Sequence, residues 1–209
     1  AHHLRFRRQR QMCIRDSGIN AITVKDGDEL LEAKLTNGNS QIMLAVKSGK
    51  AIRFEEGKTR PMGRNASGVR GIKLKDNKDE VVGMISVNDM DANILVVSEN
   101  GYGKRSSLED YRLTNRGGKG VKTINITEKT GDLITLKSVS DSDDLMIINK
   151  SGIAIRMQVE DLRVMGRATQ GVKVISLKDG DSIAAVAKVM KDDDDIEDIN
   201  DIEFTGDAV

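Results

Sequence analysis

A repeat of about 51 residues runs through this sequence. The phrase SGVRGIKL around Gly68 returns as KGVKTINI at Gly120 and as QGVKVISL at Gly171, with a weaker copy, SGINAITV, at Gly18. Four further columns keep the same step: Gly49, Gly101 and Gly152; Arg53, Arg105 and Arg156; Arg60, Arg112 and Arg163; Arg64, Arg116 and Arg167. Such periodicity indicates a stack of similar units rather than one aperiodic core.

Each unit contains short apolar runs separated by turn residues. In the second copy these runs are VRGIKL (69–74), EVVGMISV (80–87), NILVVS (93–98) and YGKRS (102–106). Runs of this length are typical of strands, and the stretches DLRVM and LEDYR could form at most a single helical turn. Asn100-Gly101 predicts a hairpin with a type I′ turn, and Ser48-Gly49 and Ser151-Gly152 fill the same slot. The predicted class is all-β.

Four-stranded units with a period near 50 are propeller blades or a propeller-like variant, since a β-solenoid has shorter coils. We expect three full units, at residues 18–67, 68–119 and 120–170, and a partial fourth at 171–189. These are too few for the usual closed ring. The chain is therefore predicted either to be a piece of a larger propeller or to pair its two ends with each other, and an unfinished array leaves strand edges open.

The formal net charge of zero conceals an uneven distribution. Residues 191–209 carry nine acids against Lys191 alone and are predicted to be a disordered acidic tail. Residues 1–17 carry five arginines and match no repeat column. They are interpreted as a foreign leader, artefactual or disordered, the alternative being an arm that binds nucleic acid. Between them, residues 18–190 hold 27 basic and 23 acidic residues. This asymmetry favours a polyanion-binding body with a tail that competes for it, the alternative being a merely solubilising tail.

No catalytic constellation is visible. His2, His3 and Cys13 all lie in the leader, and the consecutive carboxylates of Asp192 to Asp195 do not resemble a calcium loop. The glycine-rich phrase NRGGKG (115–120) has neither a Ser or Thr after its lysine nor a helical pattern behind it, so it does not predict a nucleotide site. We expect no metal or cofactor in this chain.

Basic residues recur on turns and strand edges, and a rigid repeat would align them in a stripe. Such a stripe along a curved rim suits a bent duplex, because phosphate contacts supply sequence-independent affinity. Few aromatics argue against stacking on single strands. The predicted DNA-binding residues are Lys50, Arg53, Arg64, Arg70, Lys104, Arg105, Arg116, Lys119, Lys122, Arg156, Arg167 and Lys173. The competing role, a staple between neighbouring units, is favoured for Arg60, Arg112 and Arg163, which lie close to acids such as Asp110 and Asp161.

At these residues the chain resembles the family of C-terminal domains found in the A subunit of DNA gyrase. The resemblance is carried by KAIRF, RPMGRNASGVRGIKL, ENGYGKRSSLEDYRLTNRGGKGVKTI, DDLMIINKSGIAIR and GRATQGVKVISL, which cover most of residues 18–189. It implies a six-bladed β-pinwheel that wraps DNA, of which this chain matches roughly the last half, and an acidic tail that modulates wrapping.

The resemblance also implies a larger enzyme: an ATP-dependent type II topoisomerase that introduces negative supercoils. Its ATP and Mg²⁺ would be bound by the partner B subunit of an A2B2 assembly, in the bacterial cytoplasm and on the chromosome. Here the family's wrapping motif, Gln-Arg-Arg-Gly-Gly-Lys-Gly, has only a degenerate copy at 114–120, and neither Tyr102 nor Tyr111 matches the catalytic tyrosine. We therefore expect DNA binding without cleavage. The alternatives are the related domain in the A subunit of topoisomerase IV and a protein-interaction propeller.

Overall fold

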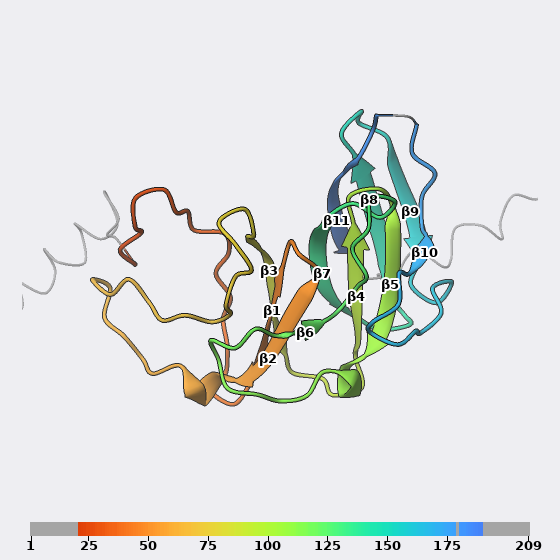
Figure 1. Cartoon of the computed structure of the whole chain (residues 1–209). Helices are drawn as coiled ribbons and strands as arrows, with labels where there is room; N and C mark the ends of the chain where they lie inside the picture. Colours follow the sequence, from red (N-terminus) through yellow and green to blue (C-terminus); the bar gives the residue numbers. More distant parts are fainter. Residues whose placement is uncertain (1–20, 179, 190–209) are drawn as a thin grey trace, which may run out of the picture.

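The computed structural model describes residues 21–178 and 180–189 (Figure 1). The predicted leader (1–17) and acidic tail (191–209) lie outside these residues. The described part contains β1 (Gln41–Val46), β2 (Lys50–Glu55), η1 (Glu56–Lys58), β3 (Val81–Val87), β4 (Asn93–Ser98), β5 (Tyr102–Ser107), η2 (Leu108–Asp110), β6 (Val121–Lys122), β7 (Leu133–Val139), β8 (Asp144–Asn149), β9 (Ala154–Gln158), β10 (Val172–Lys173) and β11 (Ile183–Val189). None of these residues forms a helix that could cross a membrane.

The strands form three antiparallel sheets that follow one another along the chain (Figure 1). The first sheet has the strand order β3-β1-β2-β6, the second β10-β5-β4-β7 and the third β11-β8-β9. The predicted all-β, propeller-like partial array is confirmed. The stretch LEDYR contributes only the 3-10 turn η2, as its length suggested.

Each sheet includes at least one strand that comes from further along the chain than its central hairpin. The hairpin β1–β2 is local, but 25 residues (56–80) separate β2 from β3, the other neighbour of β1. Met43 of β1 lies opposite Arg53 of β2 on one side and Ile85 of β3 on the other. β4 and β7, and β8 and β11, repeat this arrangement. A sheet therefore combines strands from neighbouring sequence units. The unit boundaries predicted at residues 18, 68, 120 and 171 divide the repeat at one point of its period and do not coincide with the sheets.

The hairpin turns differ from the predicted type I′. Gly49, Gly101 and Gly152 have φ of 77°, 82° and 86°, but no described residue other than glycine has a positive φ. In each turn the glycine N–H donates to the carbonyl three residues earlier, for example Gly101 N to Ser98 O at 3.1 Å. The geometry is a type I turn followed by a left-handed glycine, which needs only one positive φ.

The prediction of a strand at 69–74 is wrong. Its counterparts in the next two copies form the two-residue strands β6 and β10, which pair with β2 and β5. Residues 69–74 have no such strand beside them in the described part. Their backbone instead bonds to the loop around Gly117 and Gly118, through Gly117 N to Gly71 O at 2.5 Å and Lys73 N to Gly118 O at 2.8 Å.

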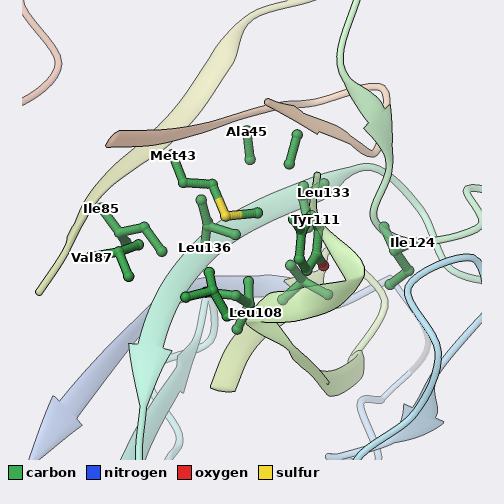
Figure 2. Close-up of a cluster of buried hydrophobic side chains, with 12 residues drawn as sticks. Met43, Ala45, Ile85, Val87, Leu108, Tyr111, Ile124, Leu133 and Leu136 are labelled. Carbon is green, nitrogen blue, oxygen red and sulfur yellow. The ribbon is translucent and has the colours of Figure 1, made fainter. Parts of the chain in front are cut away.

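The core lies between the faces of successive sheets. Met43 and Ile85 of the first sheet pack with Leu133 and Leu136 of β7, and Tyr111 and Leu108 close the cluster beside η2 (Figure 2). A second cluster joins the second and third sheets through residues such as Leu95 and Ile147. The strands β3 and β7, and β7 and β11, contact each other at one edge of the array. The two-residue strands β6 and β10 therefore lie at the opposite edge.

Gly171 tests this close packing. A Cβ atom there would lie 2.7 Å from Gly103 O, whereas at Gly152, with nearly the same φ, it would meet no atom within 4 Å. Both alanine substitutions meet the left-handed penalty of about 1–2 kcal/mol. Gly171→Ala adds overpacking of about 1–3 kcal/mol. Urea unfolding should show the larger loss of stability for Gly171→Ala, and equal losses would contradict the close approach.

Candidate nucleic-acid interface

Lysines that are exposed or half-buried lie at the edges of the first two sheets that face away from β3 and β7. Lys122 is the last residue of β6 and Lys173 the last residue of β10, and both side chains are exposed. Lys50 opens β2 and lies directly opposite Lys122 in the β2–β6 register. We call Lys50, Lys122 and Lys173 the basic edge. Its position follows from the strand order, since β6 and β10 are the end strands of the first two sheets.

The basic edge places like charges across from each other. Directly opposed residues of an antiparallel pair have Cβ atoms about 4.5–5.5 Å apart, and like charges there are destabilising. Lys122 Nζ donates to Asn125 Oδ1 at 3.2 Å, which does not neutralise it. In the second sheet Tyr102 replaces the opposed lysine beside Lys173, and Lys129 Nζ lies 5.6 Å from the centre of the Tyr102 ring. Both edges concentrate positive charge.

The loop 115–120 brings two more exposed cations together. Its bonds to residues 71–73 place Lys119 on a segment adjoining that of Arg70. Arg116, half-buried between these segments, donates to Lys58 O at 2.9 Å and to Arg70 O at 3.2 Å. Arg167 similarly donates to Lys122 O at 3.1 Å. Both arginines bind backbone carbonyls of other segments while retaining a positive charge near the basic edge, and Arg64 is exposed.

Arg53 does not reach the surface, contrary to the predicted role in DNA binding. Its residue is 7% exposed. Its guanidinium donates to Gln41 Oε1 at 2.6 Å, to Leu108 O at 2.9 Å and to Tyr111 O at 3.1 Å. Burial lowers its pKa from the usual value. Arg53 therefore ties β2 to the η2 segment of the next unit.

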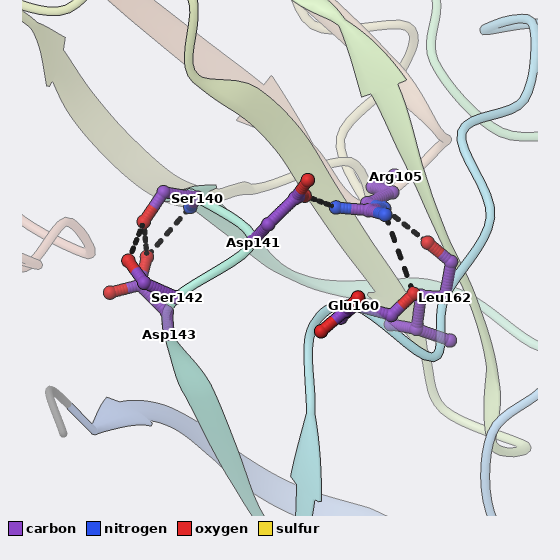
Figure 3. A network of polar contacts seen from close by, with 7 residues as sticks. All are labelled: Arg105, Ser140, Asp141, Ser142, Asp143, Glu160 and Leu162. Atoms are coloured by element: carbon purple, nitrogen blue, oxygen red, sulfur yellow. Dashed lines mark hydrogen bonds and ion pairs between the residues drawn. The ribbon is translucent and has the colours of Figure 1, made fainter.

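Arg105 has the same structural role in the following unit, and its predicted DNA contact is likewise corrected. It is 6% exposed and donates to Leu162 O and Asp141 Oδ1, with a longer bond of 3.5 Å to Glu160 O (Figure 3). The third member of this column, Arg156, is half exposed but its Nε donates to Asp144 Oδ2 at 2.7 Å. Its charge is offset within its own sheet.

Lys104 is the least expected of these side chains. It is completely buried, and its Nζ donates to Gly166 O at 2.6 Å and to Thr169 Oγ1 at 3.1 Å. Burial lowers the pKa of Lys104 to about 8, with Arg167 adding to the shift and Asp110 opposing it. No direct contact between Lys104 and a phosphate is possible through this loop.

The arginines predicted to link neighbouring units are not the ones that do so. Arg60, Arg112 and Arg163 are exposed, and none joins an ion pair with Asp110 or Asp161 in the described part of the chain. The stapling function belongs to Arg53 and Arg105. The sequence pattern did not mark this difference, because Arg53 shares its face of the strand with Ala51 and Glu55, a mixed face that does not predict burial. No group of three or more metal-ligating side chains occurs among the described residues.

Comparisons of sequence identify relatives of this arrangement. A family model described as the DNA gyrase C-terminal domain, beta-propeller, matches residues 41–88, 92–140 and 143–190. The A subunit of DNA gyrase from Staphylococcus epidermidis (strain ATCC 12228 / FDA PCI 1200) is 44% identical over 182 residues, which are 87% of this chain and 20% of that protein. The same subunit from Chlamydia muridarum (strain MoPn / Nigg) is 46% identical over 176 residues, 84% of this chain and 21% of that protein. The chain spans about a fifth of the length of these relatives.

Solved structures of such C-terminal domains have the same fold as this chain. A DNA gyrase A C-terminal domain superposes with a TM-score of 0.76 at 29% identity, covering 83% of this chain and 59% of that one. The C-terminal domain of a DNA topoisomerase IV has a TM-score of 0.77 at 24% identity, covering 81% of this chain and 53% of that one, which is a likeness of fold alone.

The division into buried and exposed arginines predicts unequal effects of truncation. Arg105→Ala leaves Leu162 O and its neighbours without their donor and should lower the free energy of unfolding by about 2–4 kcal/mol. Arg112→Ala, at an exposed position, should change it by no more than about 0.5 kcal/mol. Thermal or urea unfolding measures both. Similar small losses for the two variants would contradict the structural role of Arg105.

Proposed function

Since the chain belongs to the DNA gyrase C-terminal domain family, we propose that it binds and wraps duplex DNA within the A subunit of a gyrase. It would hold DNA without cutting it. In the whole enzyme it would act beside a B subunit that binds ATP and Mg²⁺, in an A2B2 assembly on the bacterial chromosome. The higher identity to gyrase relatives favours gyrase over topoisomerase IV.

The observation that carries this proposal is the opposed pair Lys50 and Lys122. Two lysines directly across a ladder repel each other, and a polyanion that lies along the edge relieves this repulsion. Phosphates of duplex DNA are spaced closely enough to meet both ammonium groups, and neutralising them releases counterions. A protein-interaction surface without an array of negative charge does not relieve this repulsion.

The exposed cations extend along the same edge. Lys173 occupies the position of Lys122 one sheet later, and Lys119 and Arg70 lie on adjoining segments beside the first edge. A contact set of phosphates repeated from sheet to sheet follows the backbone and is insensitive to base sequence. Of the residues expected from the sequence, we retain as direct contacts the exposed or half-exposed cations that form no ion pair with another described residue: Lys50, Arg64, Arg70, Arg116, Lys119, Lys122, Arg167 and Lys173.

Salt dependence tests the location of these contacts. The affinity of the chain for a duplex of random sequence should fall steeply with salt, with a logarithmic slope of about −0.9 for each phosphate neutralised. The triple variant Lys50→Met, Lys122→Met and Lys173→Met should reduce the magnitude of the slope by up to about 2.7, since three contacts are removed. Fluorescence anisotropy at several salt concentrations measures this.

A second triple variant supplies a control of equal charge. Lys34, Lys47 and Lys150 already pair with Glu32 at 3.0 Å, Asp132 at 3.9 Å and Glu99 at 3.8 Å. Their replacement by Met should lower affinity somewhat through net charge but leave the slope nearly unchanged. Equal slopes for the two triple variants would locate the DNA elsewhere, and no binding by the unaltered chain would refute the proposed function.

A further inference from the structure

A charged side chain lies beneath an exposed loop in the second sheet. Lys104 is fully buried in β5, yet Gly166, Ala168 and Thr169 above it are exposed. Its ammonium joins none of the ion pairs in the described part of the chain. Burying a cation without an ionic partner is costly, so this residue requires an explanation beyond the fold.

The first sheet shows that the fold does not need this lysine. Ile52 holds the corresponding position of β2, and Gly118 corresponds to Thr169 in the repeat. A Cβ atom on Gly118 would lie 3.4 Å from Ile52 Cδ1, so these two positions are neighbours in the first sheet, as Lys104 and Thr169 are in the second. One sheet has an apolar pair where the other has a hydrogen-bonded cation.

The surroundings of Lys104 make its protonation sensitive to nearby charge. Two charged groups act on it: Asp110, from η2, favours the protonated form, and Arg167, from the loop above, disfavours it. Tyr111 stays neutral because burial raises its pKa. Across the sheet, Lys104 faces Val96 of β4, and Val172 of β10 lies opposite the adjacent Gly103. An anion placed near Arg167 would therefore act on Lys104 with little competition.

We propose that the loop 166–170 is a phosphodiester-binding position controlled by the protonation of Lys104, so that binding a duplex takes up a proton there. This inference rests on the proposed function. Lys104 acts as a positioning residue, beneath the loop rather than in contact with the ligand. Arg167 and the hydroxyl of Thr169 would make the contacts.

The hydrogen bonds around Gly166 allow such a contact. Gly166 O accepts from both Lys104 Nζ, at 2.6 Å, and Thr169 Oγ1, at 2.9 Å. The hydroxyl proton of Thr169 can turn outward to a phosphate while Lys104 continues to satisfy this carbonyl. Thr169 Oγ1 is 3.1 Å from Lys104 Nζ, so a phosphate oxygen bonded to it would lie within roughly 6 Å of the ammonium. At that separation a negative charge favours the protonated lysine.

The direction of the pH effect follows from linkage. In the free chain Lys104 loses its proton as pH rises through about 8. A bound phosphate raises this pKa, so the complex holds more protons than the free chain between the two values, and affinity falls as pH rises through that window. A rise of one pKa unit corresponds to a tenfold preference for the protonated form. Between pH 7 and pH 9 the affinity for duplex DNA should fall about three- to tenfold.

The repeat itself supplies the variant for the test. The double substitution Lys104→Ile and Thr169→Gly installs the pair found in the first sheet, so the chain should keep its circular dichroism and melt cooperatively. Its duplex affinity at pH 7 should be lower than that of the unaltered chain and should lose the decline toward pH 9. Lys122→Met is the control: it should weaken binding while retaining the decline. A decline that persists in the double variant would overturn the inference.

Calorimetry on the unaltered chain needs no variant. Titration with duplex at pH 8 in buffers of different ionisation enthalpy should reveal uptake of a fraction of a proton. Binding with no proton uptake would overturn the role of Lys104 but leave the proposed function intact. Failure to bind duplex at any pH would instead refute the proposed function.

Discussion

Exchange of strands between repeat units is the constraint on which the rest of the structure depends. The hairpin β1–β2 pairs on one side with β3 and on the other with β6, and both of these strands come from later in the chain. This exchange completes the sheets, and the packing of successive sheets against one another then buries their facing sides. It also places the last residue of each two-residue strand at the free edge, which is where Lys122 and Lys173 lie. The position of the candidate interface is thus a consequence of the topology.

Positive charge serves two purposes in this array, and burial separates them. Arg53 and Arg105 use their guanidinium groups on carbonyls of the following unit, next to the isolated parallel bridges from Arg53 to Leu113 and from Arg105 to Val164. A planar, permanently charged group with several donors suits that task. The lysines of the basic edge instead form no ion pair within the described part of the chain. Lys104 combines features of both groups. It is buried like Arg53 and Arg105, but it lies close enough to the surface for its protonation to respond to a bound anion.

The sequence predicted the architecture well because periodicity and turn residues are local signals. The strands at 93–98 and 102–106, and the glycine turns, were visible in the repeat. The failures concern contacts that pattern does not encode. Residues 69–74 have the composition of a strand, but no strand among residues 21–178 and 180–189 pairs with them. Asn100 does not adopt the left-handed conformation. The repeat spacing of the basic residues was equally regular for the buried arginines, Arg53 and Arg105, and for the exposed ones. Only the three-dimensional burial of Arg53, Arg105 and Lys104 distinguishes them.

The central claim is that duplex DNA lies along the edge formed by β6 and β10. Chemical acylation of lysines, with and without a saturating duplex at low salt, tests it most directly when each site is quantified by mass spectrometry. The account predicts that Lys122 and Lys173 become several times less reactive in the complex while Lys47 and Lys150 keep their reactivity. Protection of Lys47 and Lys150 with no protection of the edge lysines would contradict it.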